Sequence, residues 1–238
     1  MTEALYRDDA YARTAKARVT GLTSDGGVVL DRTLFYPTGG GQTGDRGRLT
    51  WPGGSAEIVT TVKHDDGIAL VPAEGAVPPA PGTAVMQELD WPHRHRCMRI
   101  HTCLHLLSVV IPLPVTGGQI TAEKGRLDFD MPEAPDDKEA LQERLNALIA
   151  ADYPVDETWI TDAELAANPG LVKTMTVKPP TGAGRVRLVR IGTPEDQVDL
   201  QPCGGTHVRS TAEIGPVRLG KVEKKGRQNR RVSVFLEE

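Results

Sequence analysis

Short apolar runs separated by glycine turns fill residues 1–71 of the chain. The runs are rich in β-branched residues, which favour strands, and the glycines suit tight turns between antiparallel neighbours. The predicted strands cover residues 16–22, 27–30, 33–36, 47–50, 56–64 and 68–71. A proline-rich connection, 72–82, precedes one last strand at 84–89. This pattern predicts an N-terminal domain, residues 1–89, built as a small antiparallel β-barrel or, alternatively, a sandwich.

Beyond Asp90 the pattern changes, because helical runs join the strands. A helix is expected over 98–110, and an amphipathic helix over 136–151 carries the apolar stripe Leu141, Leu145, Leu148 and Ile149. Thr161 is expected to cap a shorter helix, with Glu164 as its capping-box partner. Further strands are expected at 120–131, 185–190, 214–222 and 231–236. The chain therefore predicts an α+β fold whose second domain, 90–238, is a two-layer α/β unit with a mainly antiparallel sheet.

Composition places the chain among ordinary soluble proteins. Its 238 residues allow one large domain or two modest ones, and its net charge is −4. No apolar run approaches the about 20 residues of a membrane span, and the N-terminus shows no signal-peptide pattern. Three cysteines are an odd number, which argues against a disulfide framework. We therefore expect a cytoplasmic protein without a membrane partner.

Two motifs about one hundred residues apart each place two potential metal ligands four residues apart. In the first, His101-Thr-Cys-Leu-His105, a helix would stack both imidazoles on one face. In the second, Cys203-Gly-Gly-Thr-His207, the glycines predict a tight turn after Pro202. Three imidazoles and one thiolate suit tetrahedral zinc, so zinc is the expected cofactor. The alternative is a coincidence of ordinary buried histidines.

A basic segment follows the second motif. Between residues 218 and 231 the only acidic residue is Glu223. The residues expected to contact a phosphate backbone are Lys221, Lys224, Lys225, Arg227, Arg230 and Arg231. The alternative is a solvated turn that only keeps the protein soluble.

Together these motifs resemble the metal-binding signature of the alanyl-tRNA synthetase editing domain and of its free-standing relatives, the alanyl-tRNA editing proteins. Other stretches agree with the same family, including Phe35-Tyr-Pro-Thr-Gly-Gly-Gly-Gln42 and Lys225-Gly-Arg-Gln-Asn-Arg-Arg231. The length and the barrel domain before the editing domain are similar to the medium-sized free-standing class. Leu104 departs from the threonine that several family members carry before the second histidine.

The resemblance implies a hydrolase that removes the wrong amino acid, chiefly serine and in some cases glycine, from tRNA for alanine. It implies that residues 90–238 form a zinc-binding tRNA-editing domain with the ligands His101, His105, Cys203 and His207. The implied partner is mischarged tRNA(Ala). The glycine motif is not a phosphate-binding P-loop, because no Gly-Lys-Ser/Thr sequence follows it, so no ATP is expected to bind. The oligomeric state stays open.

An editing site must accept serine and spare alanine, which lacks the hydroxyl. A site that hydrogen-bonds the serine hydroxyl does so, because bound alanine would leave the buried polar groups of the site unpaired. The nearest polar candidates by motif position are Thr102, Gln119, Thr121 and Thr206. Each could instead be an ordinary threonine or glutamine of a turn or strand. The resemblance also implies that Gly40, Gly41 and Gln42 lean toward the editing pocket, although three glycines could simply form a hairpin.

Two other classes of protein compete with the editing enzyme. A zinc peptidase would carry His-Glu-x-x-His, whose glutamate is the general base, and Thr102 cannot take that part. A zinc-stabilised tRNA-binding module without catalytic activity would also use four protein ligands and a basic face. Only 4% of the residues are aromatic, which counts against a general RNA binder.

Overall fold

The computed structural model describes residues 2–65, 67–135, 137–175 and 184–237. The chain divides into two compact units, Met1–Cys97 and Met98–Glu238. Helix α1 (Trp91–Val110) begins in the first unit and ends in the second. Among the described residues, no helix is long and apolar enough to cross a membrane. Antiparallel pairing dominates both units, as the sequence predicts for an α+β protein.

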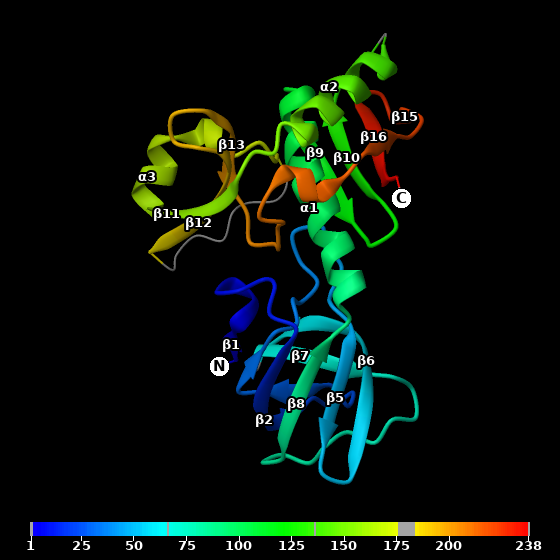
Figure 1. Ribbon diagram of the computed structural model, residues 1–238, viewed down its shortest axis with the longest axis vertical. Coiled ribbons are helices and arrows are strands. Elements are labelled where there is room, and N and C mark those ends of the chain that lie inside the picture. Colours follow the sequence, from blue (N-terminus) through cyan, green and yellow to red (C-terminus); the bar gives the residue numbers. More distant parts are fainter. Residues whose placement is uncertain (1, 66, 136, 176–183, 238) are drawn as a thin grey trace. The chain divides into compact units, whose positions relative to one another are not determined.

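The first unit is a closed β-barrel, which confirms the sequence prediction (Figure 1). Its strands, in spatial order, are β2 (Thr14–Leu22), β3 (Val28–Leu30), β7 (Gly67–Pro72), β6 (Gly54–His64), β5 (Gly47–Trp51) and β8 (Ala84–Leu89). Beside the barrel, β1 (Glu3–Ala4) pairs in parallel with β4 (Arg32–Thr33), and a 3-10 turn, η1, covers Leu5–Arg7. Buried residues such as Leu49, Ile58 and Leu70 fill the barrel. Alternating inward apolar positions therefore hold it together.

The strand expected at 33–36 is largely wrong, because β4 ends at Thr33. The backbone beyond it bonds to side chains instead of to a strand. The Tyr36 amide donates to Asp45 Oδ2 at 2.5 Å, and the Leu34 carbonyl accepts from Arg94 of α1 at 2.7 Å. Arg94 also donates through Nε to Asp45 Oδ1 at 3.0 Å, and both side chains are fully buried. This ion pair anchors the glycine-rich segment to the start of α1 within the first unit.

The main sheet of the second unit packs against α1. Its strand order is β14 (Val217–Leu219), β16 (Asn229–Leu236), β10 (Gly125–Asp130) and β9 (Val115–Ile120). A fifth strand, β15 (Glu223–Lys225), also pairs with β16. The strand expected at 120–131 is present but shorter than predicted, because a turn at residues 121–124 separates β9 from β10. A Cβ at Gly125 would lie 2.4 Å from Ile100 Cγ2, so only glycine lets α1 approach β10 this closely.

The amphipathic helix of the second unit is α2 (Lys138–Ala150). Asp137 caps it by accepting from the Ala140 amide at 2.8 Å, whereas the expected start at Asp136 lies outside the described residues. Leu145 and Ile149 of the predicted stripe are buried. The strand expected at 214–222 is shorter than predicted, since the 3-10 turn η3 (Thr211–Ile214) precedes β14.

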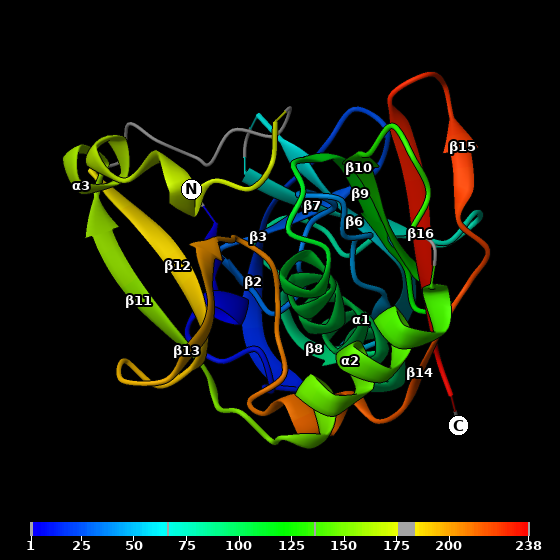
Figure 2. The ribbon, with the colours of Figure 1, turned by 90° about the horizontal axis from the view of Figure 1, so that it is seen from above.

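A separate three-stranded sheet completes the second unit, and Figure 2 shows its strands side by side. The strands are β11 (Val155–Thr161), β12 (Arg185–Gly192) and β13 (Gln197–Pro202). Helix α3 (Asp162–Ala167) and the 3-10 turn η2 (Pro169–Leu171) lie between β11 and β12 in the chain. Thr161 and Glu164 form the predicted capping box. Leu165 of α3 packs on Val186 and Leu188. The opposite face of this sheet carries Asp199 and Gln201 of β13, because side chains alternate along a strand.

Candidate metal centre

The two ligand motifs converge on one cluster within the second unit. The Cys203 Sγ lies 3.4 Å from His101 Nε2 and 3.2 Å from His207 Nε2. One ligand atom from each of His101, His105, Cys203 and His207 lies within 4.8 Å of the others. The ring centroids of His105 and His207 are 4.6 Å apart. The structure therefore brings the four predicted ligand residues together.

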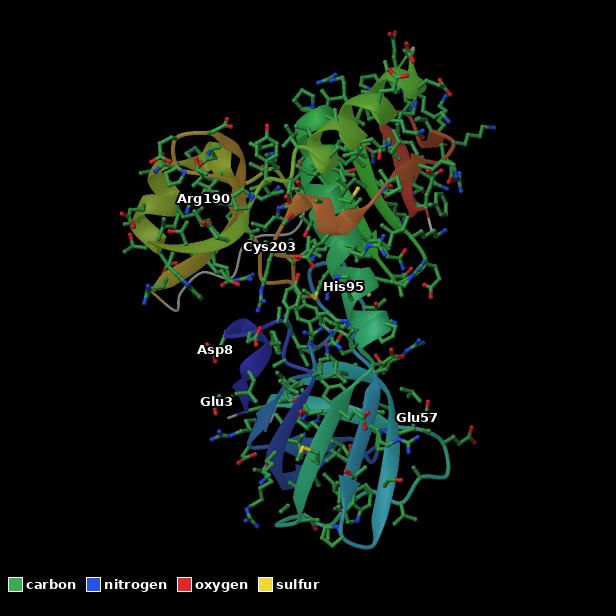
Figure 3. The ribbon with its side chains drawn as sticks, viewed as in Figure 1. Glu3, Asp8, Glu57, His95, Arg190 and Cys203 are labelled. Atoms are coloured by element: carbon green, nitrogen blue, oxygen red, sulfur yellow. The ribbon has the colours of Figure 1, made fainter. Side chains whose placement is uncertain are left out.

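Regular elements present these ligands. His101 and His105 occupy successive turns of α1, so both imidazoles leave the same face of the helix. Cys203 directly follows β13, and Figure 3 labels it at the end of that strand. The Gly205 amide donates to Cys203 Sγ at 3.4 Å, which closes the turn that brings His207 back.

Arg187 of β12 holds the same turn from the other side. Its Nη1 donates to the carbonyls of Cys203 at 2.7 Å and of Gly205 at 3.0 Å. Its Nε donates to Glu157 of β11 at 2.7 Å. Two main-chain carbonyls of the ligand turn are thus fixed by one guanidinium, which is itself held by a carboxylate.

The cluster fits a tetrahedral metal ion. Zinc bonds of about 2.0–2.3 Å place neighbouring ligand atoms about 3.3–3.7 Å apart in a tetrahedron. The distance of 3.4 Å from Cys203 Sγ to His101 Nε2 falls within that range, and the 3.2 Å to His207 Nε2 lies just below it. His101, His105 and His207 are each less than a tenth exposed. Imidazole nitrogen and thiolate sulfur are both donors that zinc accepts.

The protonation states suit metal binding at two of the ligands. Burial by itself would raise the pKa of Cys203, but His101 and His207 hold that pKa well below its usual value. Burial, reinforced by the nearby His101, holds the pKa of His207 well below its usual value. A thiolate and a neutral imidazole are the forms that coordinate a metal.

His105 behaves differently. Burial would lower the pKa of His105, but hydrogen bonds to Asp199 and Cys203 raise it to about 9. The distance from His105 Nδ1 to Asp199 Oδ2 is 3.1 Å. Because Nδ1 faces this carboxylate, Nε2 is the nitrogen that remains for coordination, and a metal ion would displace the proton that the raised pKa places there when no metal is bound.

Thr102 supports His207 in a similar position. Its Oγ1 lies 3.1 Å from His207 Nδ1 and accepts from the Val208 amide at 3.3 Å. With Nδ1–H donating to this hydroxyl, His207 presents Nε2 to the cluster. Thr102 is fully buried. Thr102, which the sequence suggests as a substrate residue, thus contacts the Nδ1 side of the metal-ligand candidate His207.

The structure brings only some of the other predicted substrate residues to the cluster. Thr206 is 1% exposed and lies between the ligands of the second motif. Gln119 pairs with Arg126, whose Nε donates to Gln119 Oε1 at 3.1 Å on the sheet face opposite Gly125 and α1. Thr121 accepts from the Lys124 amide at 3.3 Å in the turn between β9 and β10.

The glycine-rich loop belongs to the first unit. Gly40 and Gly41 have φ angles of +57° and +83°, which other residues rarely adopt. Gly39 and Gln42 exchange two main-chain hydrogen bonds of 3.0 Å, so the three glycines do form a tight hairpin. The Gln42 side chain is buried. The action of this loop on an editing pocket stays a prediction.

The basic segment forms the β15–β16 hairpin. Lys221, Lys224, Lys225 and Arg227 are exposed along it, while Arg230 is half-buried. Arg231 is bound to Asp128 of β10 through hydrogen bonds of 2.7 and 2.9 Å. Four of the predicted cations are therefore exposed, whereas Arg231 links β16 to β10 through Asp128.

The groups that support the cluster do not stand out in the sequence. They are Ser108, Lys173, Arg187, Asp199 and Gln201. A signal exists for two of them, since Asp199, Gln201 and Cys203 alternate and would share one face of a strand. The alternating positions are polar, however, and the apolar pattern predicts no strand there.

The fold and the cluster define a two-unit protein related to aminoacyl-tRNA synthetases. Residues 186–233 match the family model of the threonyl and alanyl tRNA synthetase second additional domain. Residues 7–93 match the model of class II (A) tRNA synthetases. The chain belongs to the family of the alanyl-tRNA editing proteins AlaX-M.

Similarity to these relatives extends over the whole chain. The alanyl-tRNA editing protein AlaX-M of Methanosarcina acetivorans is 35% identical over 247 residues, which cover 99% of each chain. That of Methanosarcina barkeri is 35% identical over 245 residues, again 99% of each. The alanine–tRNA ligase of Pyrobaculum neutrophilum is 36% identical over 231 residues, 94% of this chain and 25% of the ligase. The chain thus spans about a quarter of the ligase.

Proposed function

We propose that this protein deacylates mischarged tRNA(Ala) in the cytoplasm, chiefly the seryl form and in some cases the glycyl form, by hydrolysing the aminoacyl ester. The convergence of His101, His105, Cys203 and His207 within 4.8 Å carries the proposal. The full-length similarity to the AlaX-M editing proteins supports it.

In this proposal zinc is the cofactor, held by the thiolate and the three imidazoles. A zinc ion with an open coordination position would be a Lewis acid that could polarise the ester carbonyl, acidify a water or anchor the substrate. Four protein ligands close a tetrahedral shell, so the chain's own polar groups must orient the attacking water. The aminoacyl ester is labile, so we propose that positioning a water to attack its carbonyl carbon is the main contribution of these polar groups.

Discrimination against alanine requires a polar group near the amino acid. Thr206 is our candidate, because it is buried within the ligand turn. Thr102 acts through His207 instead, since its hydroxyl accepts from the Val208 amide and lies 3.1 Å from His207 Nδ1. Gln119, bonded to Arg126, and Thr121, bonded to the Lys124 amide, stay candidates for contact with the substrate away from the ligand cluster.

The tRNA backbone is proposed to contact the β15–β16 hairpin. Lys221, Lys224, Lys225 and Arg227 are exposed there and can approach phosphates. Arg231 is proposed to support the hairpin through Asp128 rather than to bind tRNA. The barrel domain, residues 1–89, is proposed to contribute the Gly40–Gly41 loop to substrate binding.

The decisive experiment measures deacylation of seryl-, glycyl- and alanyl-tRNA(Ala) by the wild type and by Cys203→Ala. Cys103→Ala is the matched control, because Cys103 is a fully buried cysteine of the same unit outside the ligand set. We expect rapid loss of serine, intact alanine, an inactive Cys203→Ala and an active Cys103→Ala. A wild type that binds zinc and tRNA but releases no amino acid would refute the enzyme and favour a zinc-stabilised tRNA-binding module.

A further inference from the structure

A closed polar network lies behind His105, on the Nδ1 side of its imidazole. Asp199 of β13 is 3% exposed, yet its Oδ2 lies 3.1 Å from His105 Nδ1. The two residues are 94 positions apart in the chain, so this contact joins α1 to the three-stranded sheet. A carboxylate buried this deeply needs partners for its remaining lone pairs.

Three other side chains supply those partners. Lys173 Nζ donates to Asp199 Oδ1 at 2.5 Å, and Gln201 Nε2 donates to Asp199 Oδ2 at 2.7 Å. Lys173 also donates to Ser108 Oγ at 3.2 Å. The Ser108 hydroxyl in turn donates to the His105 carbonyl at 2.7 Å. The network therefore holds the His105 main chain and side chain at the same time.

The ammonium of Lys173 decides the charge of this network. It lies 2.5 Å from Asp199 Oδ1, so its positive charge compensates the buried carboxylate. Lys173 itself is held in place because its carbonyl accepts from the Val115 amide of β9 at 3.0 Å. Asp199 thus faces His105 as a neutralised but strong acceptor.

We propose that Asp199, neutralised by Lys173 and held by Gln201, is a positioning residue that fixes His105 with its proton on Nδ1 and Nε2 directed at the metal. A neutral imidazole can carry its proton on either nitrogen, and only an acceptor at Nδ1 makes Nε2 the ligand in every molecule. The inference rests on the proposed function only for its use of the four-ligand metal site.

The same cluster contains a useful contrast. His207 meets the neutral hydroxyl of Thr102, whereas His105 meets a carboxylate. A carboxylate partner increases the basicity of a ligating imidazole more than a hydroxyl does. Loss of Asp199 should therefore weaken the metal site through His105, by the about 10- to 100-fold that such outer partners contribute.

A merely structural tie between α1 and β13 is the competing interpretation. Asp199→Asn tests it, because the amide keeps the size of the carboxylate but directs either its NH2 group or a weaker carbonyl at His105. Asp128→Asn is the matched control. Asp128 is also a carboxylate of the second unit with two arginine partners, but it lies on the sheet face away from α1.

The experiment measures the zinc dissociation constant by competition with a chromophoric chelator, on protein kept well below its unfolding transition. We expect zinc binding to weaken about 10- to 100-fold in Asp199→Asn and to stay at the wild-type value in Asp128→Asn. The Co²⁺ absorption spectrum of Asp199→Asn should also change, since one ligand is no longer held. Equal zinc affinity in wild type and Asp199→Asn would overturn the inference.

A second measurement needs no variant. In zinc-loaded wild-type protein, ¹⁵N NMR of the histidine rings should show His105 with a proton on Nδ1 and the metal at Nε2. Metal at Nδ1 of His105 would refute the positioning role even if Asp199→Asn failed to fold. Neither readout uses deacylation, so a wild type that spares seryl-tRNA(Ala) would defeat the proposed function while leaving this inference standing.

Discussion

At the scale of single residues, the cluster depends on what stands behind each imidazole. Thr102 is placed one position after the first ligand, yet its hydroxyl serves the last ligand, His207. Along α1, His101 and His105 share the face that meets the cluster, and the next position, Thr102, reaches the outer nitrogen of His207. One turn of helix therefore carries both ligands and a support for a third.

Replacement of Thr102 by valine tests that support. Valine keeps the shape but removes the acceptor that Thr102 Oγ1 offers to His207 and to the Val208 amide. We expect zinc affinity to fall by about 10-fold, and the buried unpaired amide to cost about 1–3 kcal/mol of stability. Zinc competition and urea unfolding measure the two effects.

Two controls accompany this variant. Thr102→Ser retains the hydroxyl and should keep the wild-type zinc affinity. Thr121→Val removes a hydroxyl from the turn between β9 and β10 and should leave zinc binding unchanged. If serine weakened zinc binding as much as valine does, the hydroxyl would not be the group that matters.

At the scale of elements, the β15–β16 hairpin combines two charge roles. Its exposed cations face solvent, whereas Arg231 at the base of the hairpin is bound to Asp128 of β10. Asp128 also accepts from Arg126 at 2.8 Å, so one carboxylate neutralises two guanidiniums. Lys225 already pairs with Glu223 at 2.9 Å. The sheet thus supports a hairpin on which Lys221, Lys224 and Arg227 are exposed to solvent.

Removal of the outer charges should weaken tRNA binding in a salt-dependent way. We expect Lys224→Gln with Arg227→Gln to lower the slope of log affinity against log salt by about one unit for each phosphate that the protein no longer neutralises. Filter binding or fluorescence anisotropy over a range of salt concentrations measures this slope. The control is Lys138→Gln with Arg144→Gln, which removes two cations from α2. An equal change in both pairs would mean that no specific contact forms at the hairpin.

The Asp128 ion pairs predict how stability depends on pH. Burial would raise the pKa of Asp128, but Arg231 and Arg126 lower it below its value of 3.8 in the unfolded chain. A lowered folded-state pKa stabilises the protein above the unfolded-state pKa, and this contribution disappears as the pH falls through the folded-state pKa. Asp128→Asn should therefore lose stability at neutral pH and show little difference from wild type in strong acid. Urea unfolding at both pH values checks this, and a difference that persisted in acid would rule out the ion pairs as its source.

At the scale of the whole molecule, the sequence predicts the barrel and the ligands better than the parts that support them. The barrel strands alternate and are separated by glycine turns, and the ligands come as two contiguous motifs. Strand β13 escapes prediction because its buried positions, Asp199 and Gln201, are polar, so the apolar alternation that marks a strand is absent. Strand β9 escapes it because Gly117 and Gly118 lower its strand propensity. The network around His105 joins distant segments, which no local pattern can predict.

Metal removal should affect the two compact units differently. The cluster ties α1 to the turn after β13 within Met98–Glu238, whereas the barrel within Met1–Cys97 has its own buried core. Zinc bound only to the folded state adds about 4 kcal/mol of stability when its free concentration is about 1,000 times the dissociation constant. A strong chelator should therefore reduce hydrogen-exchange protection in β10 and β16 while the amides of β5 and β6 keep theirs.

Cys203→Ala sharpens the measurement, because a chain without the thiolate ligand should resemble the chelated wild type and respond little to further chelator. Cys103→Ala should respond to chelator as the wild type does. An equal loss of protection in β5 and β10 would show that the units unfold together and that zinc stabilises both. Unchanged protection everywhere would show that the four side chains hold their arrangement without a metal, and the hydrogen bonds that Asp199 and Thr102 make with the imidazoles would then be sufficient to keep the cluster assembled.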